Sequence, residues 1–406
     1  SDLAGKLKLT HRVIDSASGS SFTLSTGQSL TLANFGSQGA TSLFESTISG
    51  AGSLIKAGAA ALTFTGTNDY SGGTTISAGT LQIGNGGTSG ALNANSTITN
   101  NGMLAFNRSN TITQGTDFAG VLTGAGNITQ AGSGTLLLTG NNTYTGTTTL
   151  SAGTLEVGAA GRLGGGAYAG NIANNGTLIY SGSNAQTLSG VISGTGALTQ
   201  NAASTLTLSG NNTYTGATTL SAGTLTLGNV SALGTGAITV ASGATLNLNN
   251  LGVSNAVTVA TGGNITGGPQ ADSPAVLAKL TGTNSIDTVL TGSVGLEKTD
   301  GGELTLSTPN FFTGAVEANV AGAVIKAAFL ADTSSSLGTS TLTDPANLVL
   351  GSGATLEFTG GTTTSTARSF TIGGSAGIAA TGAGTLEFTS ASQLATTGEA
   401  PALTLT

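Results

Sequence analysis

The chain has 406 residues, of which only 7% are charged and 38% are hydrophobic, and its formal net charge is −7. Disordered chains combine low hydrophobicity with high net charge, so this composition argues against disorder despite the 67 glycines. The lack of cysteine excludes disulfides and thiolate zinc sites, and the acidic balance argues against nucleic acid as a partner, because nucleic acid requires a concentrated basic surface.

The N-terminal segment, residues 1–45, is not repetitive, and we expect it to cap the fold. It contains the single histidine, His11. A hydrolase triad could be drawn from His11, Asp15 and one of many serines, yet nothing beyond composition supports it. No G-x-S-x-G elbow is present to hold a nucleophile. We therefore interpret His11 as an ordinary residue of the cap.

Residues 46–269 contain three copies of one phrase, and a weaker fourth copy follows. The copies start at Leu62, Leu136, Leu206 and Leu304, about 74, 70 and 98 residues apart, and the third reads LTLSGNNTYTGATTLSAGTLTLG. A repeat of this kind buries its apolar face only against its neighbours. We expect a stacked array whose function belongs to an extended surface rather than to a pocket.

Three short strands are predicted in each copy, because apolar and polar residues alternate with a period of two. The first strand presents threonine on its outer face, at Thr63, Thr207 and Thr305. The second strand ends at Ile76, Leu150 and Leu220. Glycines lie between the strands, where we expect turns with positive φ: Gly66, Gly140, Gly210, Gly79, Gly153 and Gly223.

Two all-β architectures have short, regular strands of this kind, the propeller and the solenoid. A propeller must close into a ring, which the drift of the repeat to about 98 residues makes awkward, whereas a solenoid accepts irregular insertions as longer loops. The segment ITNNGMLAF from Ile98 also matches IANNGTLIY from Ile172. We predict a parallel β-helix (β-solenoid), a single elongated rod with roughly 20-odd residues per coil and about three coils per repeat.

Each copy carries an aromatic residue at the same place and an asparagine two residues earlier. The aromatic residues are Tyr70, Tyr144, Tyr214 and Phe312, and the asparagines are Asn68, Asn142, Asn212 and Asn310. We interpret them as structural corners, in which the ring caps the core and the asparagine bonds the backbone of the turn. Stacking of the rings on a ligand is the alternative.

Residues 270–345 are the irregular part of the chain. The segment DSPAVLAKL from Asp272 has an N-cap, an early proline and spacing compatible with a helix, so it predicts a short helix or a loop excursion. The fourth copy also loses alternation, with Lys326 near a site that is apolar in the other copies. Loops that project from a repeat scaffold are the usual place for binding, and a decayed copy explains the same facts without function.

The densest acidic group is Glu297, Asp300 and Glu303, beside Lys298. A glycosidase needs two carboxylates held a few ångströms apart across a bond. Spacings of three on a turn between strands favour a solvated corner instead. No calcium-binding loop is present, and we expect neither a metal nor a cofactor.

Residues 346–406 are expected to continue the β-helix. Glu357 and Glu387 each lie between apolar neighbours, which predicts outward positions on strands. The chain stops at PALTLT, where Leu403 and Leu405 match the opening of a further repeat. We expect the chain to end in mid-repeat.

These copies resemble the passenger-associated transport repeat of autotransporter proteins. The resemblance rests on the segments Gly50–Gly84, Gly124–Gly158 and Gly194–Gly228, the second of which reads GAGNITQAGSGTLLLTGNNTYTGTTTLSAGTLEVG. It implies a right-handed β-helix passenger of a Gram-negative bacterium, displayed at the cell surface or secreted and exported by a C-terminal β-barrel translocator. Passengers of this kind include adhesins, autoaggregation factors, proteases, esterases and toxins.

The leading hypothesis is therefore an adhesin or autoaggregation module. A weakly charged face rich in Thr, Ser and Asn suits lateral association with a second copy, or contact with a host surface protein or glycan, through many weak bonds acting together. An inert stalk is the alternative among non-enzymes. A carbohydrate-acting β-helix enzyme with its site in residues 270–345 is the alternative from another class.

Overall fold

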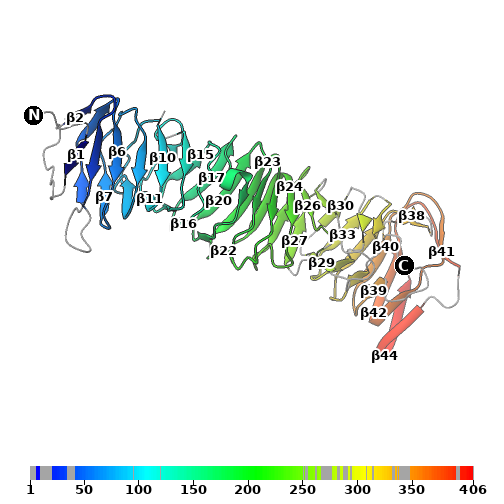
Figure 1. Cartoon of the computed structure of the whole chain (residues 1–406). Helices are drawn as coiled ribbons and strands as arrows, with labels where there is room; N and C mark the ends of the chain where they lie inside the picture. The colour runs from blue at the N-terminus through cyan, green and yellow to red at the C-terminus, as the bar shows by residue number, and fades with distance from the viewer. Residues whose placement is uncertain are drawn as a thin grey trace, which may run out of the picture. The chain divides into compact units, whose positions relative to one another are not determined.

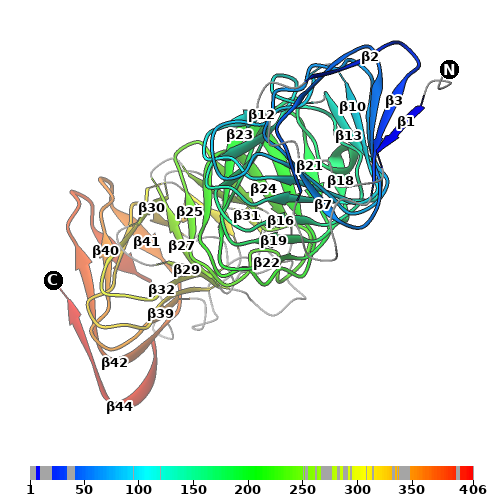
Figure 2. The ribbon, with the colours of Figure 1, turned by 90° about the vertical axis from the view of Figure 1, so that its left-hand side faces the viewer.

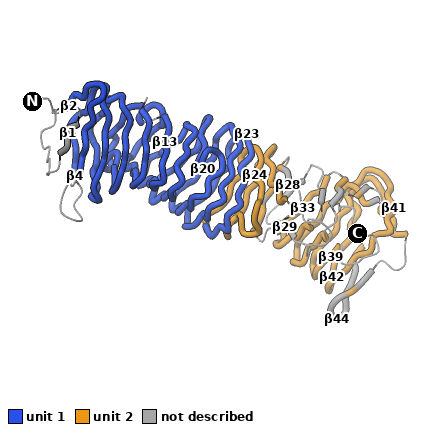
Figure 3. Tube along the Cα trace, in the orientation of Figure 1, with its two compact units in different colours: residues 1–215 blue, residues 216–406 orange. Residues whose placement is uncertain are grey.

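The computed structural model describes residues 6–9, 21–33, 42–94, 96–118, 120–249, 251, 255–260, 263–266, 277–280, 284–286, 291–292, 295–307, 309–312, 315–331, 334–335, 337, 348–389 and 394–405. The chain divides into two compact units, residues 1–215 and 216–406 (Figure 3). Each unit is described by itself.

Unit 1 is built from short parallel strands (Figure 1). One sheet contains β1 (Lys6–Leu9), β3 (Ser29–Leu32), β6 (Ser53–Lys56), β8 (Thr74–Ile76), β10 (Thr97–Asn100) and β13 (Val121–Thr123). A second contains β4 (Ser42–Phe44), β7 (Ala61–Phe64), β9 (Thr80–Ile83), β11 (Met103–Phe106), β14 (Asn127–Gln130), β16 (Thr148–Leu150), β19 (Ile172–Asn174) and β22 (Ile192–Ser193). A third series contains β12 (Ile112–Thr113), β15 (Thr135–Leu138), β17 (Thr154–Ala159), β18 (Ala167–Tyr168), β20 (Thr177–Gly182), β21 (Gln186–Leu188) and β23 (Ala197–Leu208). Strands β2 (Ser21–Leu24) and β5 (Thr47–Gly50) form a separate pair, and the turn Gly164–Gly166 is a single 3₁₀ turn.

The strands of unit 1 wind as coils around a common apolar core, and Figure 2 shows the sheets on different sides of these coils. Strand β15 illustrates the packing, because Leu136 and Leu138 are fully buried while Thr135 and Leu137 lie outside. Apolar residues at every second position thus bury one side of each strand, as the alternation predicts. Thr207 follows the expected outward pattern, but Thr63 is buried.

Neighbouring coils are about 20 residues apart along the chain. Leu62 pairs with Leu81, 19 residues later, and Leu104 pairs with Ile128, 24 residues later. Register is specified strongly here, because a slip by one residue would turn every apolar side chain outward. The predicted all-β parallel solenoid is confirmed.

Each repeat is three coils and one further strand long, not a whole number of coils. From Leu62 the second sheet leads through Leu81 and Leu104 to Ile128. The counterpart of Leu62 in the next copy is Leu136, which lies on the following strand, β15, in the third series of strands. The same step recurs from Leu136, through three coils, to the third copy. Successive copies in unit 1 therefore occupy successive faces of the coil.

The glycines of the repeat act in two different ways, one of which the sequence analysis predicted wrongly. Gly79, Gly153 and Gly223 have positive φ values of 69°, 63° and 68°, as predicted. Gly66, Gly140 and Gly210 do not have positive φ. A Cβ atom on Gly140 would lie 2.3 Å from the Gly120 carbonyl oxygen of the adjacent coil. The second set of glycines is required by close approach of backbones rather than by backbone conformation.

Unit 2 is also a stack of parallel strands. Its main series is β24 (Thr218–Leu227), β25 (Ile238–Val240), β26 (Thr245–Asn247), β27 (Ala256–Val259), β28 (Asn264–Thr266), β29 (Leu277–Leu280), β30 (Asn284–Ile286), β32 (Gly295–Lys298), β33 (Glu303–Leu306), β35 (Val316–Ala318), β36 (Val324–Ala327), β39 (Leu348–Leu350), β40 (Thr355–Phe358), β42 (Phe370–Ala380) and β44 (Leu394–Leu405). Three small pairs complete it: β31 (Thr291–Gly292) with β34 (Phe311–Phe312), β37 (Leu330–Ala331) with β38 (Ser334–Ser335), and β41 (Thr364–Thr366) with β43 (Leu386–Phe388). Among the described pairings, only that of β37 with β38 is antiparallel.

The helix predicted after Asp272 is wrong for its second half. Residues 277–280 form strand β29, which pairs in parallel with β27 and β32. Residues 272–276 lie outside the described part of the chain. Hydrogen bonding to two neighbouring coils satisfies the backbone of 277–280 and overrides the local helical spacing.

The fourth copy keeps its alternation, contrary to the sequence analysis. Ile325 and Ala327 are buried and Lys326 points outward. The reason is one additional buried residue, Ala323, between the turn glycine Gly322 and the strand. The segments SGATLNL and SGATLEF have the same turn, with Ala244 and Ala354 buried, so the inward frame of the fourth copy is shifted by one residue.

No helix in the described part of the chain has the length and apolar character needed to cross a membrane. The division into segments 1–45, 46–269, 270–345 and 346–406 stays a prediction, as do the handedness of the coil and the single rod.

Candidate functional site

The corner asparagines of unit 1 bind the preceding coil. The side-chain oxygens of Asn68, Asn142 and Asn212 accept hydrogen bonds from backbone N–H groups 20 residues earlier, at distances of 2.9, 3.0 and 2.7 Å. The donors are Ile48, Leu122 and Ile192. All three asparagines are buried, where an unpaired backbone donor would be costly.

Asn142 has the most extensive set of partners among these asparagines. Its Nδ2 donates to the Gly140 carbonyl at 3.0 Å and to Gln114 Oε1 at 3.0 Å. Its Oδ1 also accepts from Gln114 Nε2 at 2.6 Å. Asn142 is fully buried, so this network replaces every contact with water.

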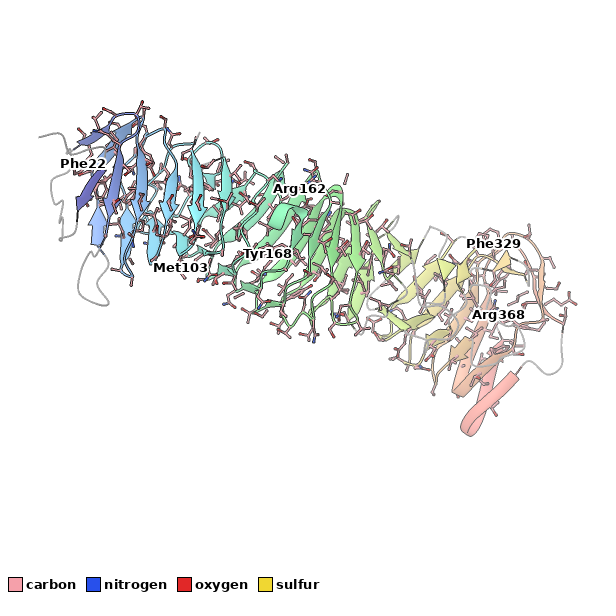
Figure 4. The ribbon with its side chains drawn as sticks, in the orientation of Figure 1. Phe22, Met103, Arg162, Tyr168, Phe329 and Arg368 are labelled. Carbon is pink, nitrogen blue, oxygen red and sulfur yellow. The ribbon has the colours of Figure 1, made fainter. Side chains whose placement is uncertain are left out.

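The corner tyrosines are buried and hydrogen-bonded within the core. Tyr144 Oη lies 2.8 Å from Thr148 Oγ1, which in turn lies 2.7 Å from Tyr168 Oη. The rings of Tyr144 and Tyr168 (labelled in Figure 4) are 5.4 Å apart at 60°. Burial raises the pKa of Tyr70 and of Tyr144 well above the usual 10.0. Tyr70, Tyr144 and Tyr214 present no ring face to a ligand, since each has no exposed surface.

The fourth corner is described in part. Asn310 is fully buried, and its backbone N–H donates to the Ser335 carbonyl at 2.7 Å. Phe312 lies in β34, but its side chain is outside the described part of the chain.

A set of buried donors that the sequence analysis missed closes the turn after the first strand before each copy. Lys56 Nζ donates to the carbonyl oxygens of Ala57, Gly58 and Ala78 at 3.0, 2.9 and 3.1 Å. Gln130 and Gln200 each donate from Nε2 to two turn carbonyls. Burial lowers the pKa of Lys56 from its usual 10.5. The signal was the spacing of Lys56, Gln130, Gln200 and Lys298, which equals that of the copies.

Replacing Lys56 with methionine should lower the free energy of unfolding by about 2 kcal/mol, because hydrogen bonds from a charged donor to buried carbonyls are lost. Lys56→Gln is the matched control, since glutamine already fills this position at Gln130 and Gln200, and it should stay within about 1 kcal/mol of the wild type. Urea unfolding of the three proteins measures the difference. Equal loss in both variants would show that the charge, not the turn bonding, matters.

The acidic group of residues 297–303 is not a pair of facing carboxylates. Lys298 is buried and donates to Asp300 Oδ1, which also accepts from the Gly302 N–H at 3.2 Å. Burial lowers the pKa of Lys298 from its usual 10.5. Glu303 points instead toward Lys326, with 3.0 Å between Oε1 and Nζ. Each of the two carboxylates thus has its own cation.

Glu303, Lys326 and Glu357 form a ladder of charge across three coils. Lys326 Nζ is also 3.7 Å from Glu357 Oε2, and Lys326 and Glu357 are register partners on β36 and β40. The two carboxylates raise the pKa of Lys326 above its usual 10.5. Glu357 and Glu387 lie on the outward side of their strands, the first half-buried and the second exposed. Such exposed pairs contribute little to stability.

No group of three or more His, Cys, Asp and Glu side chains that could hold a metal occurs within the described ranges. His11 and Asp15 of the hypothetical triad fall outside those ranges.

The outward face of β3, β6, β8, β10 and β13 is uncharged. Its central row, in register from coil to coil, is Thr31, Ile55, Thr75, Thr99 and Thr123. Thr123 Oγ1 lies 3.4 Å from Thr99 Oγ1, so hydroxyls of adjacent coils meet along the row. The other outward residues of β3, β6, β10 and β13 are Ser29, Ser53, Thr97 and Val121.

The outward face of the second sheet in unit 1 is similar. Its central row includes Ala105, Thr129, Thr149, Ala173 and Ser193. Met103, labelled in Figure 4, lies on the same side of β11 as Ala105. These two faces offer hydroxyl and methyl groups in regular rows and almost no electrostatic repulsion.

Comparison with known proteins gives two likenesses. The model of the passenger-associated transport repeat matches residues 54–83, 128–157, 198–227 and 296–323. The adhesin BmaC autotransporter of Brucella suis biovar 1 (strain 1330) is 48% identical over 121 residues, which are 30% of this chain and 3% of that protein. The chain therefore spans a small part of the length of this relative. No solved structure matches.

Proposed function

We propose, from the premise that this chain is an autotransporter passenger segment at the cell surface or secreted, that it acts as an adhesin or autoaggregation module. The printed name of the Brucella relative, an adhesin, supports this proposal. In the full-length protein a C-terminal translocator would carry the passenger out of the cell.

The observation that carries the proposal is the uncharged outward row Thr31–Ile55–Thr75–Thr99–Thr123. One hydrogen bond to such a row adds about 1 kcal/mol net, so binding requires many bonds at once. The parallel register provides that number, because equivalent hydroxyls recur on successive coils at about 4.8 Å. The ligand is a second copy of the chain or a host surface protein or glycan.

The experiment compares two double variants that differ only in the face they alter. Thr75→Lys with Thr123→Lys places charge on the first face, on two coils separated by Thr99. Thr129→Lys with Ala173→Lys does the same on the second sheet, with Thr149 between them. We expect one of the two variants to lose about tenfold or more in self-association or in binding to host cells, measured by sedimentation and by cell binding.

The corner asparagines and tyrosines are structural in this proposal, because their polar atoms point into the coil and bond it. The same observation favours the alternative function, an inert stalk. A stalk would show no binding in the wild type and none to lose in either variant. A carbohydrate-acting enzyme is not favoured, since Asp300 and Glu303 each pair with a lysine.

A further inference from the structure

Three Asn-Gly steps occur in unit 1, at Asn85, Asn101 and Asn175. In an Asn-Gly step the backbone nitrogen of glycine can attack the asparagine side chain, because glycine has no Cβ to block the approach. The reaction requires a free side chain and room to rotate the backbone. The three steps share one dipeptide and differ in their surroundings.

Asn101 and Asn175 are held on both sides of the reacting bond. Asn101 Oδ1 accepts from the Ala125 N–H at 3.4 Å, and Asn175 Oδ1 accepts from the Thr195 N–H at 3.2 Å. The following glycine nitrogens donate to the side chains of the preceding asparagines, Gly102 to Asn100 at 3.1 Å and Gly176 to Asn174 at 3.2 Å.

Packing restrains the same two glycines. A Cβ atom on Gly102 would lie 2.5 Å from the Gly79 carbonyl oxygen, and one on Gly176 would lie 2.3 Å from that of Gly153. The backbone at both steps is therefore wedged against the adjacent coil and cannot rotate without opening it.

Asn85 is in the opposite situation. It is exposed in the loop between β9 and β10, and its side chain makes no hydrogen bond to the described residues. A Cβ atom on Gly86 or Gly87 would meet nothing within 4 Å. One restraint exists, the hydrogen bond from the Gly86 N–H to the Asn107 carbonyl at 2.8 Å, and a single bond in an exposed loop opens easily.

We propose that Asn85 is a site of spontaneous succinimide formation, through which unit 1 acquires a carboxylate with time. The Gly86 nitrogen forms a bond to Cγ of Asn85, the bond from Cγ to Nδ2 breaks, and ammonia leaves with the proton of the Gly86 N–H. Water then adds to either carbonyl of the ring and yields aspartate or isoaspartate. No oxidant, reductant or catalyst takes part.

The test is incubation of the folded chain in mildly alkaline buffer, followed by mass spectrometry of its proteolytic peptides. Asn85 should convert at least about tenfold faster than Asn101 and Asn175, because those two react only from locally opened states. Asn85→Gln should remove the fast conversion and leave the slow ones unchanged.

Incubation in denaturant provides the second measurement. Without the fold, the three steps should convert at similar rates, because each is the same dipeptide. Conversion of Asn101 or Asn175 as fast as Asn85 in the folded chain would overturn the proposal. So would an unchanged ranking in denaturant, since the difference would then come from flanking sequence rather than structure.

Discussion

Replacing Asn142 with leucine should lower the free energy of unfolding of the chain by about 4 kcal/mol. The substitution keeps the bulk of the side chain but removes its acceptor from the Leu122 N–H and both of its bonds to Gln114. At least two buried polar groups are left without a partner, each at a cost of about 1–3 kcal/mol. Urea unfolding measures the change.

Asn141→Ala is the matched control, since Asn141 is adjacent but exposed, and it should change stability by less than about 0.5 kcal/mol. Hydrogen exchange at the Leu122 amide adds a local readout, because this amide should lose protection in Asn142→Leu and keep it in the control. A loss below about 1 kcal/mol would mean that water replaces the asparagine.

Replacing Gly153 with alanine should cost at least about 4 kcal/mol, because two effects combine. Its φ of 63° is strained for a residue with a Cβ. The added Cβ would also lie 2.3 Å from the Gly134 carbonyl oxygen and 2.5 Å from that of Gly132. Backbone of the adjacent coil, which other coils hold in place, would have to move.

Two further variants separate the effects. Gly243→Ala has a φ of 76° and nothing within 4 Å, so it should cost only about 1 kcal/mol. Gly146 lacks positive φ, but its Cβ would lie 2.2 Å from the Gly126 carbonyl oxygen, so Gly146→Ala isolates the collision. If Gly153→Ala were no worse than Gly243→Ala in thermal unfolding, the coils would be looser than described.

Alternation in the sequence was enough to predict the strands and their inward residues, because burial of one side leaves a period of two in every coil. Leu136 and Leu138 are one example. The same pattern carries no information on which residue of the next coil stands opposite. The role of Gly140 was therefore predicted wrongly, since its reason is a carbonyl in the adjacent coil.

Polar residues in the core were the hardest to predict. Lys56 appeared to be a surface charge, yet it is buried and bonds three turn carbonyls. In the fourth copy, the single residue Ala323 shifted the inward frame, so alignment to the other copies placed Lys326 on the wrong side. For the candidate site, the sequence identified the corner positions but not their bonding partners 20 residues earlier.

The length of the repeat in unit 1 makes duplication a rotation as well as an extension. Because one copy advances the chain by three coils and one strand, inserting a copy would move every following residue to the next face of the coil. Copy number then sets an angle, and only a change by three copies would restore the original direction. Strains that differ by one copy would thus display the same downstream sequence toward a different side, with no change in any residue of that sequence.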